Sequence, residues 1–448
     1  MDSRQIADLT ARELARFIAE RPRSTALLDR AAHSMPSGVP MAWMRGLYHH
    51  PPVFVASGAG ARFTDVDGHA YVDFNQADMS SNAGHAVPEM VEAVQERMAA
   101  GTQFLLPVED AIAVSEELAR RFGLSHWQYT LSASSANAEA IRLARLASGR
   151  ERVLILDGSY HGHLGETMLD YHGAGEHESY GLGMARDHGR NTTIVPFNDL
   201  ESVEAVLARG ETACVLVEPA LTNVGLVLPA AGFLDGLRQL CDRHGALMVA
   251  DETHTHMFAF GGLVRLWGLK PHIVVLGKNL AGGVAIGAYG MGAELAEVMD
   301  RHLFDHAGDA PGLATGGTLY GNALSLAAAR ATLDHVLTEA GYARNARLGE
   351  RLARGIQGMI DEAGLAWRAQ HLTSRAGWLY SHREPVTGTQ AVEVMDVALS
   401  DGRRLYMANR GVWEAIVTAG PAVSFAMTET DIDLYLEVAG AWLDDLLR

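Results

Sequence analysis

The middle of the chain alternates short apolar runs with longer amphipathic segments. Four runs are apolar at consecutive positions and rich in β-branched residues, as strands buried on both faces are. They lie at residues 152–157, 213–219, 246–252 and 272–277. Residues 136–148 and 232–245 instead repeat apolar positions with a helical period. Strands of this kind, separated by helices, predict an α/β fold with a mostly parallel sheet covered by helices.

The pattern of apolar and polar positions changes from about Ala323. Long helical patterns follow, then a strand-like run and a last amphipathic segment. They lie at residues 323–337, 345–364, 376–382 and 431–447. We therefore expect a large domain over residues 71–325 and a small α+β domain over residues 326–448. Residues 1–70 should form an N-terminal segment that packs on the small domain, with hairpin character near residues 60–74.

Composition and charge narrow the class of protein. The chain has 448 residues, of which 48% are hydrophobic and 20% charged, as in ordinary globular enzymes. Its net charge of -18 would repel phosphate backbones and anionic membranes, so we expect neither nucleic acid nor membrane as a partner. No apolar run reaches transmembrane length, which predicts a soluble, cytoplasmic protein. Cys214 and Cys241 lie in a strand-like and a helix-like run and are expected to be buried thiols.

The basic residues are distributed unevenly between lysine and arginine. Of 36 basic residues only Lys270 and Lys278 are lysines, and Lys278 stands between a strand-like run and a glycine pair. Arginine does not lose its proton in a protein, whereas lysine can become a neutral, nucleophilic amine. Lys278 is therefore a candidate catalytic amine, with a surface or phosphate-binding lysine as the alternative.

Polar residues follow the predicted strands at their carboxyl ends. They are Tyr160, His161, Glu218, Asp251 and Lys278. Ligands of open α/β sheets bind beyond this edge, so these side chains are candidates for one site. Taken singly, Asp251 could cap a helix, Glu218 could close a turn and Tyr160 could belong to the core.

A cluster of small residues precedes the helical segment at 136–148. Ser132, Ala133, Ser134 and Ser135 would leave backbone N–H groups at a helix N-terminus facing a bound phosphate. Simple N-capping by serine explains the same residues. Neither a Walker pattern nor a dinucleotide fingerprint is present.

One cofactor uses all of these groups together, namely pyridoxal 5'-phosphate (PLP). It is held by a lysine Schiff base, a phosphate-binding turn and an aspartate at the pyridine nitrogen. Two opposite charges about 4 Å apart gain about 4 kcal/mol at an effective dielectric constant of 20, enough to keep that nitrogen protonated. The amine of Lys278, once displaced by the substrate amine, could carry a proton from the substrate Cα to the cofactor.

From about Met35 to the C-terminus the sequence resembles the class III aminotransferases of PLP fold type I. Within them it resembles the branch of glutamate-1-semialdehyde aminomutase and β-amino-acid aminotransferases. The resemblance rests on the ordered motifs DVDGHAYVDF, GHAVPEM, SASSANAEAIRLAR, SYHGH, VEP, ADETHT, LGKNLAGG and GGTLYGN.

The resemblance implies a homodimer with active sites shared at the subunit interface. It implies that the PLP phosphate is bound by Ser134 and the backbone amide of Ala133, next to Ser132. It also implies that the Asp251 carboxylate contacts the pyridine nitrogen of PLP. It also implies that Thr318 reaches the phosphate in the partner subunit. Further residues implied to lie around the cofactor are Tyr160, His161, Glu218 and His254.

The chain departs from the family pattern at several of these positions. Ala133 and Ser135 replace the usual glycine and glutamate of the phosphate turn. Thr253 stands where valine is usual, and His254 stands where glutamine or methionine is common near the cofactor hydroxyl. His254 could be a substitute hydrogen-bond donor or could join proton transfer.

Histidine pairs raise the question of a metal. In the pairs His161/His163 and His254/His256, alternate spacing would put both rings on one face of an extended run. With 20 histidines in the chain, such pairs are expected by chance, and we predict no metal site.

The function expected is that of a PLP-dependent aminotransferase, which moves an amino group from a small amino donor to a keto acceptor. An aminomutase, racemase or epimerase on the same scaffold is the nearest alternative, and a lyase or a catalytically weak regulatory protein are others. A substrate carboxylate is typically bound by the guanidinium group of an arginine. Arg45, with Trp43 as an apolar wall, is the first candidate and Arg410 the second.

Overall fold

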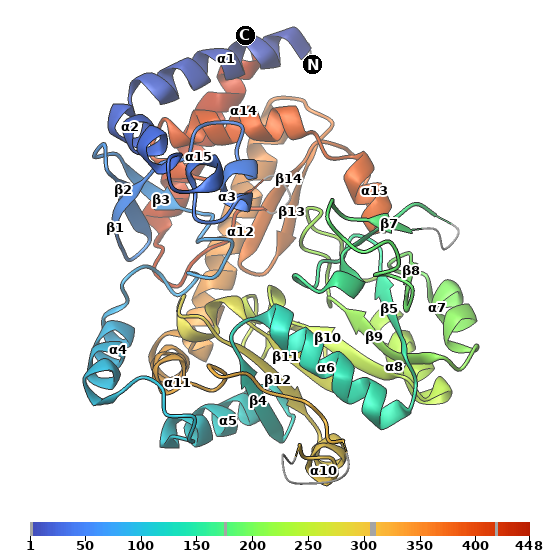
Figure 1. The fold of residues 1–448 in the computed structure, drawn as a ribbon. Helices are drawn as coiled ribbons and strands as arrows, with labels where there is room; N and C mark the ends of the chain where they lie inside the picture. Colours follow the sequence, from blue (N-terminus) through green and yellow to red (C-terminus); the bar gives the residue numbers. More distant parts are fainter. Residues whose placement is uncertain (1–2, 174–176, 305–310, 417–419) are drawn as a thin grey trace. The chain divides into compact units, whose positions relative to one another are not determined.

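The computed structural model describes residues 3–173, 177–304, 311–416 and 420–448. The chain divides into two compact units (Figure 1). Unit 1 comprises residues 1–87, 343–383 and 394–448, and unit 2 comprises residues 88–342 and 384–393. Among the described residues, no helix has the length and apolar character that crossing a bilayer requires.

Unit 2 is built on a mixed sheet of seven described strands in the order β4-β12-β11-β10-β9-β5-β8. These strands are β4 (His126–Thr130), β5 (Arg152–Leu156), β8 (Thr192–Val195), β9 (Thr212–Val217), β10 (Leu247–Asp251), β11 (Ile273–Leu276) and β12 (Gly287–Met291). The four strands predicted from apolar runs are β5, β9, β10 and β11, which are neighbours and parallel to one another. Among the described strands, β12 runs antiparallel to its two neighbours, β11 and the edge strand β4. The mostly parallel sheet expected from the sequence is therefore present.

Helices flank this sheet. The helix α6 (Ala133–Ser148) packs across β9, β10, β11 and β12, and its N-terminus follows β4. The other helices of unit 2 are α4 (Pro88–Ala100), α5 (Glu109–Phe122), α7 (Leu200–Leu207), α8 (Phe233–His244), α9 (Gly262–Leu266), α10 (Ala293–Arg301), α11 (Ala323–Ala331) and α13 (Gly388–Glu393). A small hairpin of β6 (Leu169–Tyr171) and β7 (His177–Ser179) lies outside the sheet.

Unit 1 joins the two ends of the chain. Its four-stranded sheet has the order β1-β2-β3-β15, in which the N-terminal β3 pairs with the C-terminal β15. The strands are β1 (Val55–Ala59), β2 (Arg62–Asp65), β3 (Ala70–Asp73), β15 (Val412–Trp413) and the separate pair β13 (Arg368–Leu372) and β14 (Arg375–Leu379). The hairpin expected near residues 60–74 is the pair β2–β3.

The helices of unit 1 come from both ends of the chain. They are α1 (Ser3–Ala19), α2 (Pro22–Ala31), α3 (Trp43–Gly46), α12 (Glu339–Glu362), α14 (Val397–Ala408) and α15 (Glu429–Leu447). The first four residues of α12 are counted with unit 2. The last helix starts at a capping box in which the backbone N–H of Thr428 donates to Asp431 at 2.8 Å.

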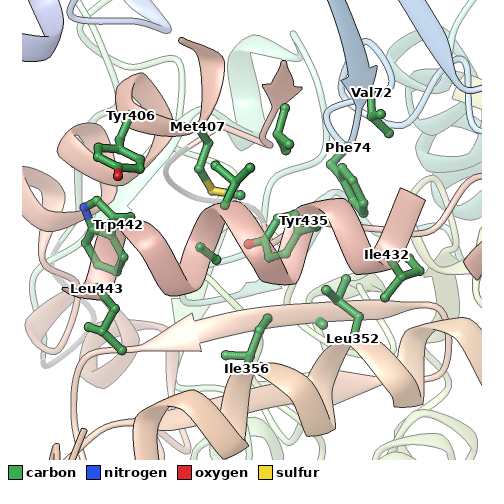
Figure 2. Close-up of a cluster of buried hydrophobic side chains, with 14 of the residues drawn as sticks. Val72, Phe74, Leu352, Ile356, Tyr406, Met407, Ile432, Tyr435, Trp442 and Leu443 are labelled. Carbon is green, nitrogen blue, oxygen red and sulfur yellow. The ribbon is translucent and has the colours of Figure 1, made fainter. Parts of the chain in front are cut away.

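The core of unit 1 gathers around α15. Figure 2 shows Tyr435 of α15 between Met407 of α14 and Ile356 of α12, and Trp442 of α15 below Tyr406 of α14. Full burial of an aliphatic or aromatic side chain is worth about 1.5–3 kcal/mol, so this cluster holds the N- and C-terminal segments together.

The boundaries of the units differ from those expected at residues 70 and 325. Residues 71–87 belong to unit 1, because β3 is bonded to β2 and β15. Residues 323–342 belong to unit 2, because α11 packs on α4 and α5. The helical pattern expected over residues 323–337 also changes period, since α11 ends at Ala331 and a π-helical turn follows at Thr332–Val336.

Both cysteines are buried free thiols, Cys214 in β9 and Cys241 in α8, as expected. Burial raises the pKa of each thiol to about 12, so neither is a thiolate at neutral pH.

Candidate active site

Two adjacent parallel strands deliver Asp251 and Lys278 to the same edge of the sheet. Asp251 ends β10 and pairs in register with Val275 of β11, after which Lys278 opens the short turn Lys278–Ala281. The backbone of Lys278 has φ +46°, in the left-handed region that costs a residue with a side chain about 1–2 kcal/mol. Such strain persists where the surrounding structure fixes it, and it is concentrated at functional positions.

The Asp251 carboxylate is buried and accepts hydrogen bonds at both oxygens. Its Oδ2 accepts from Asn137 Nδ2 at 2.8 Å and lies 2.9 Å from His161 Nδ1. Its Oδ1 accepts from the backbone N–H of Thr253 at 3.0 Å and from the Thr253 hydroxyl. Burial on its own would raise the pKa of Asp251. The hydrogen bond and charge of His161, with the bonds from Thr253 and Asn137, outweigh burial and lower that pKa below its ordinary value.

Asp251 is therefore an ionised carboxylate at neutral pH, able to pair with a cation. Because an ionised carboxylate only accepts hydrogen bonds, the bond to His161 places a proton on Nδ1 of that ring. The other ring nitrogen, Nε2, is buried and has no hydrogen-bond partner among the described residues.

Glu218 follows β9 and connects two loops at the same edge. Its Oε1 accepts from the backbone N–H of Tyr160 at 2.8 Å and from Asn223 Nδ2 at 3.2 Å, while its Oε2 accepts from the Thr222 hydroxyl at 2.7 Å. Glu218 thus fixes the backbone that positions Tyr160, whose side chain is 39% exposed. Burial raises the pKa of Glu218, and the nearby Asp251 carboxylate adds to that rise.

At the N-terminus of α6, Ser132 caps the helix and the Ser134 hydroxyl is fixed by a hydrogen bond. Ser132 is the N-cap and accepts from the backbone N–H of Ser135 at 3.3 Å, so the capping interpretation holds for Ser132. Ser134 Oγ accepts from the backbone N–H of His163 at 3.1 Å. A Cβ on Gly162, where φ is +86°, would lie 2.1 Å from Ser134 Oγ. The Ser134 hydroxyl accepts one hydrogen bond and still has its own proton, which it can donate to an anion. The backbone N–H groups of the first turn of α6 can donate to the same anion.

The methyl group of Ala133 fits this turn because of a neighbouring glycine. A Cβ added to Gly277, just before Lys278, would lie 2.8 Å from the Cβ of Ala133. The turn tolerates the Ala133 side chain because Gly277 has none.

The rings of His254 and His256 have different hydrogen-bond partners in the structure. His254 Nδ1 lies 2.8 Å from Thr222 Oγ1, whereas His256 Nε2 lies 3.2 Å from the carbonyl oxygen of Gly277. The expectation of an extended run was wrong here, because residues 255–257 form a 3-10 turn. The described part of the chain contains no group of three or more His, Cys, Asp or Glu side chains that could hold a metal ion.

Of the remaining candidates, Thr318 belongs to unit 2, and Arg45 and Trp43 belong to unit 1. Thr318 is exposed in unit 2, and its carbonyl oxygen accepts a hydrogen bond from Gln103. Arg45, in unit 1, donates to the carbonyl oxygen of His50 at 3.1 Å, and Trp43 is 49% exposed.

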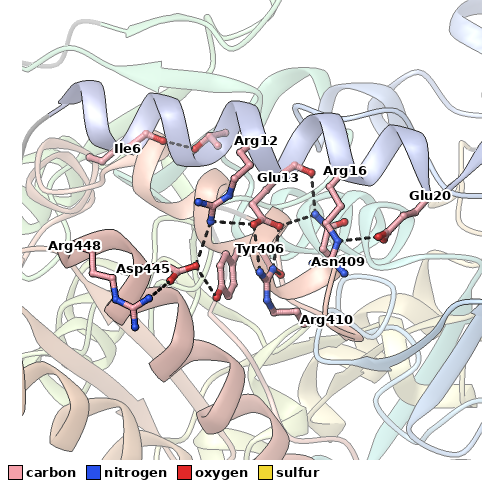
Figure 3. A network of polar contacts seen from close by, with 11 residues as sticks. Ile6, Arg12, Glu13, Arg16, Glu20, Tyr406, Asn409, Arg410, Asp445 and Arg448 are labelled. Carbon is pink, nitrogen blue, oxygen red and sulfur yellow. Dashed lines mark hydrogen bonds and ion pairs between the residues drawn. The ribbon is translucent and has the colours of Figure 1, made fainter.

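Arg410 forms an ion pair that links two helices of unit 1. Figure 3 shows its guanidinium at Glu13 of α1, with Nη1 2.9 Å from Glu13 Oε2. Nη1 also donates to the carbonyl oxygen of Tyr406. The guanidinium of Arg410 is thus committed to linking α1 and α14.

The sequence analysis did not predict three polar residues of the cluster. Asn137 could have been found as a polar position on the otherwise apolar, buried face of the helical segment that became α6. Thr222 and Asn223 lie in a loop, and nothing in the sequence alone ties them to Glu218 or His254.

Comparisons with known proteins identify the family to which the chain belongs. Residues 44–363 match the family model of class III aminotransferases. The chain is 32% identical to a glutamate-1-semialdehyde 2,1-aminomutase of Nitratidesulfovibrio vulgaris, over 93% of this chain and 98% of that protein.

Solved structures give the same result. A glutamate-1-semialdehyde aminomutase from Pseudomonas aeruginosa, solved in complex with PMP, superposes with a TM-score of 0.95 at 35% identity, over 100% of this chain and 99% of the other. A β-phenylalanine aminotransferase from Variovorax paradoxus superposes with a TM-score of 0.87 at 26% identity, over 98% and 97%. The chain therefore belongs to the class III aminotransferase family of PLP-dependent enzymes and has their type I fold.

Proposed function

We propose that this protein is a PLP-dependent aminotransferase that moves an amino group from an amine or amino acid to a keto acid through Lys278. The observation that carries the proposal is the buried, ionised Asp251 at the sheet edge from which Lys278 also emerges. PLP, when bound, supplies a carbon that bonds covalently to an amine and a ring that accepts electrons.

The donor set fits this cofactor. The Asp251 carboxylate would hold a proton at the ring nitrogen, and His161 and Asn137 keep that carboxylate oriented and charged. Ser134 would donate its hydroxyl proton to the phosphate, beside the amide of Ala133. The other residues that we assign to the cofactor pocket are Ser132, Tyr160, Glu218, His254 and Thr318.

Lys278 would bind the cofactor covalently and act as the proton carrier. A substrate amine that takes its place leaves a neutral amine able to remove the proton at the substrate Cα and deliver it to the cofactor. General base catalysis of this kind typically contributes about 10²–10⁴ in rate. An arginine at this position could do neither, because it stays protonated.

The active unit that we propose is a homodimer in which Thr318 reaches the phosphate of the partner subunit. Large apolar side chains are exposed on two segments of unit 2 that are hydrogen-bonded to each other through Gln103 and Thr318. They are Phe104, Leu105, Leu106 and Leu319, which are 47%, 72%, 71% and 50% exposed. Exposed apolar groups in such a cluster are typical of interaction surfaces.

Light scattering tests the dimer. The parent should have twice the mass of the chain, and a variant with Leu105→Glu and Leu106→Glu should be monomeric. Leu182→Glu is the matched control, because Leu182 is fully exposed elsewhere in unit 2. A monomeric parent, or an equal loss of mass in the control, would rule out this interface.

A glutamate-1-semialdehyde-type aminomutase is the second candidate, and the names of the similar proteins favour it. An aminomutase returns the nitrogen to the same molecule, whereas an aminotransferase releases a carbonyl product. Incubating the PLP-loaded protein with an amine donor alone separates the two. Stoichiometric release of carbonyl compound supports the aminotransferase, and isomerisation of glutamate-1-semialdehyde without such release supports the aminomutase.

The substrates can be identified by assaying a panel of α-, β- and ω-amines as donors, with pyruvate and 2-oxoglutarate as acceptors. We propose that Arg45 binds the substrate carboxylate and that Trp43 forms an apolar wall. The cytoplasmic location stays a prediction from the sequence.

A further inference from the structure

A chain of three buried, hydrogen-bonded side chains joins the loop after β9 to the turn after β10. Thr222 Oγ1 lies 2.7 Å from Glu218 Oε2 and 2.8 Å from His254 Nδ1. The three side chains are almost completely buried. His254 and Thr222 therefore share one polar connection to a carboxyl group that also fixes the backbone of Tyr160.

The number of protons in this chain determines the tautomer of His254. A threonine hydroxyl has one proton and can donate only one hydrogen bond at a time. When Glu218 is ionised, its carboxylate can only accept hydrogen bonds, so the hydroxyl of Thr222 gives its proton to Glu218. The remaining bond, between Thr222 Oγ1 and His254 Nδ1, must then use a proton on the ring nitrogen.

We propose that Thr222 is a positioning residue that, together with Glu218, holds the proton of neutral His254 on Nδ1 and so makes Nε2 the basic nitrogen of the ring. The use of that nitrogen beside the cofactor rests on the function proposed above, whereas the tautomer itself does not.

The same chain gives His254 a route for a proton. When Nε2 takes up a proton, the Nδ1 proton passes to Thr222 Oγ1, and the hydroxyl proton passes to Glu218 Oε2. His254 Nε2 and Glu218 Oε2 each gain one bond to hydrogen, His254 Nδ1 loses one, and Thr222 Oγ1 gains one and loses one. The net result is a neutral glutamic acid and a neutral imidazole with its proton on Nε2. No imidazolium is left in the buried site, where an isolated charge is costly.

The surroundings of Glu218 suit this role. Its Oε1 already accepts two N–H donors, so the proton belongs on Oε2, which faces Thr222. The other charged groups that act on Glu218 are His161, which lowers its pKa, and Asp251, which raises it. Burial has the largest effect and raises the pKa, so the neutral acid is within reach at the end of the route.

The tautomer can be measured without cofactor or activity. In protein labelled with ¹⁵N-histidine, solid-state NMR distinguishes protonated from unprotonated ring nitrogens, and the His254→Gln variant identifies the signals of His254. We expect a protonated Nδ1 and an unprotonated Nε2 in the parent and in Thr222→Ser, which keeps the hydroxyl. Thr222→Val has nearly the same shape and should lose this preference. A parent with the proton on Nε2, or a Thr222→Val variant with unchanged signals, would overturn the proposal.

The role beside the cofactor is tested by the pH midpoint of the visible absorbance of the PLP-loaded protein. Thr222→Val should move that midpoint by about one pH unit, as expected for the loss of one buried hydrogen bond, and Thr222→Ser should not. In a His254→Gln background the substitution Thr222→Val should have no further effect. An equal shift in both backgrounds would contradict a route through His254. A parent that shows the expected tautomer but no cofactor absorbance would instead contradict the proposed function.

Discussion

His161 Nδ1 lies 2.9 Å from Asp251 Oδ2, and both side chains are buried. His161 lies in the loop after β5 and Asp251 is the last residue of β10, so the parallel sheet brings together two residues that are 90 positions apart in the sequence. This contact is the main reason that Asp251 stays charged in spite of its burial.

Replacing His161 should therefore weaken cofactor binding through Asp251. His161→Leu removes the N–H donor, raises the pKa of Asp251 and leaves a less charged partner for the ring nitrogen. A hydrogen bond to a charged group contributes about 1.5–3 kcal/mol, so we expect the Kd for PLP to rise by about tenfold to a hundredfold. His161→Asn, whose amide nitrogen can occupy the place of Nδ1, is the matched control. Fluorescence titration of the apoprotein gives the Kd, and equal losses in both variants would contradict this role.

Ala133 and Gly277 should behave as a coupled pair. Gly277→Ala brings a methyl group against that of Ala133, and overpacking of this kind costs about 1–3 kcal/mol of unfolding free energy. Adding Ala133→Gly removes one of the two methyl groups and should recover part of that cost. Urea denaturation of the four proteins in this cycle measures the coupling. Strictly additive effects would show that the two residues do not share the turn as described.

Glu252 should make the stability of the protein fall as pH rises. Burial raises its pKa from the ordinary value of 4.5 to about 7, so between these values the folded protein binds more protons than the unfolded chain. The stabilising contribution is complete below pH 4.5 and is lost as pH rises through about 7.

The matched variant is Glu252→Gln, which can still accept from the backbone N–H of Val264. Between pH 5 and pH 8 the unfolding free energy of the parent should fall by up to about 3 kcal/mol more than that of the variant. The same pH dependence in both proteins would show that the carboxyl group of Glu252 does not titrate in this range.

Arg45 and Arg410 should respond differently to substitution. Arg410→Ala leaves the buried carboxylate of Glu13 without its main partner and should lower the unfolding free energy by about 3 kcal/mol. Arg45→Ala should leave stability within about 0.5 kcal/mol of the parent, because Arg45 is exposed. On the proposed function it should raise the KM for substrates with a carboxylate and not for simple amines. Thermal melts and steady-state kinetics on both variants distinguish the two roles.

The sequence predicted those parts of the molecule that depend on local pattern. The short apolar runs of β5, β9, β10 and β11 favour buried strands, and parallel strands bring Asp251, Glu218 and Lys278 to one edge. The residue types at this edge indicated PLP, and the ordered family motifs pointed to the same cofactor.

The remainder depends on tertiary contacts that no local pattern encodes. The helical pattern near Ala323 does not reveal that α11 packs on α4 and α5, so the expected boundary fell too early. Thr222 can bond to both Glu218 and His254 only because its loop places it between them. The spacing of His254 and His256 suggested one face, but a 3-10 turn sends the two rings to different partners.

The central claim is that the amine of Lys278 forms the covalent bond to PLP. Reduction of the PLP-loaded protein with borohydride, followed by proteolysis and mass spectrometry, tests it directly. The account predicts a pyridoxyl phosphate label on the peptide that contains Lys278, and none in a Lys278→Ala variant or on Lys270. A label on Lys270, or a Lys278→Ala variant that turns over substrate as fast as the parent, would contradict it.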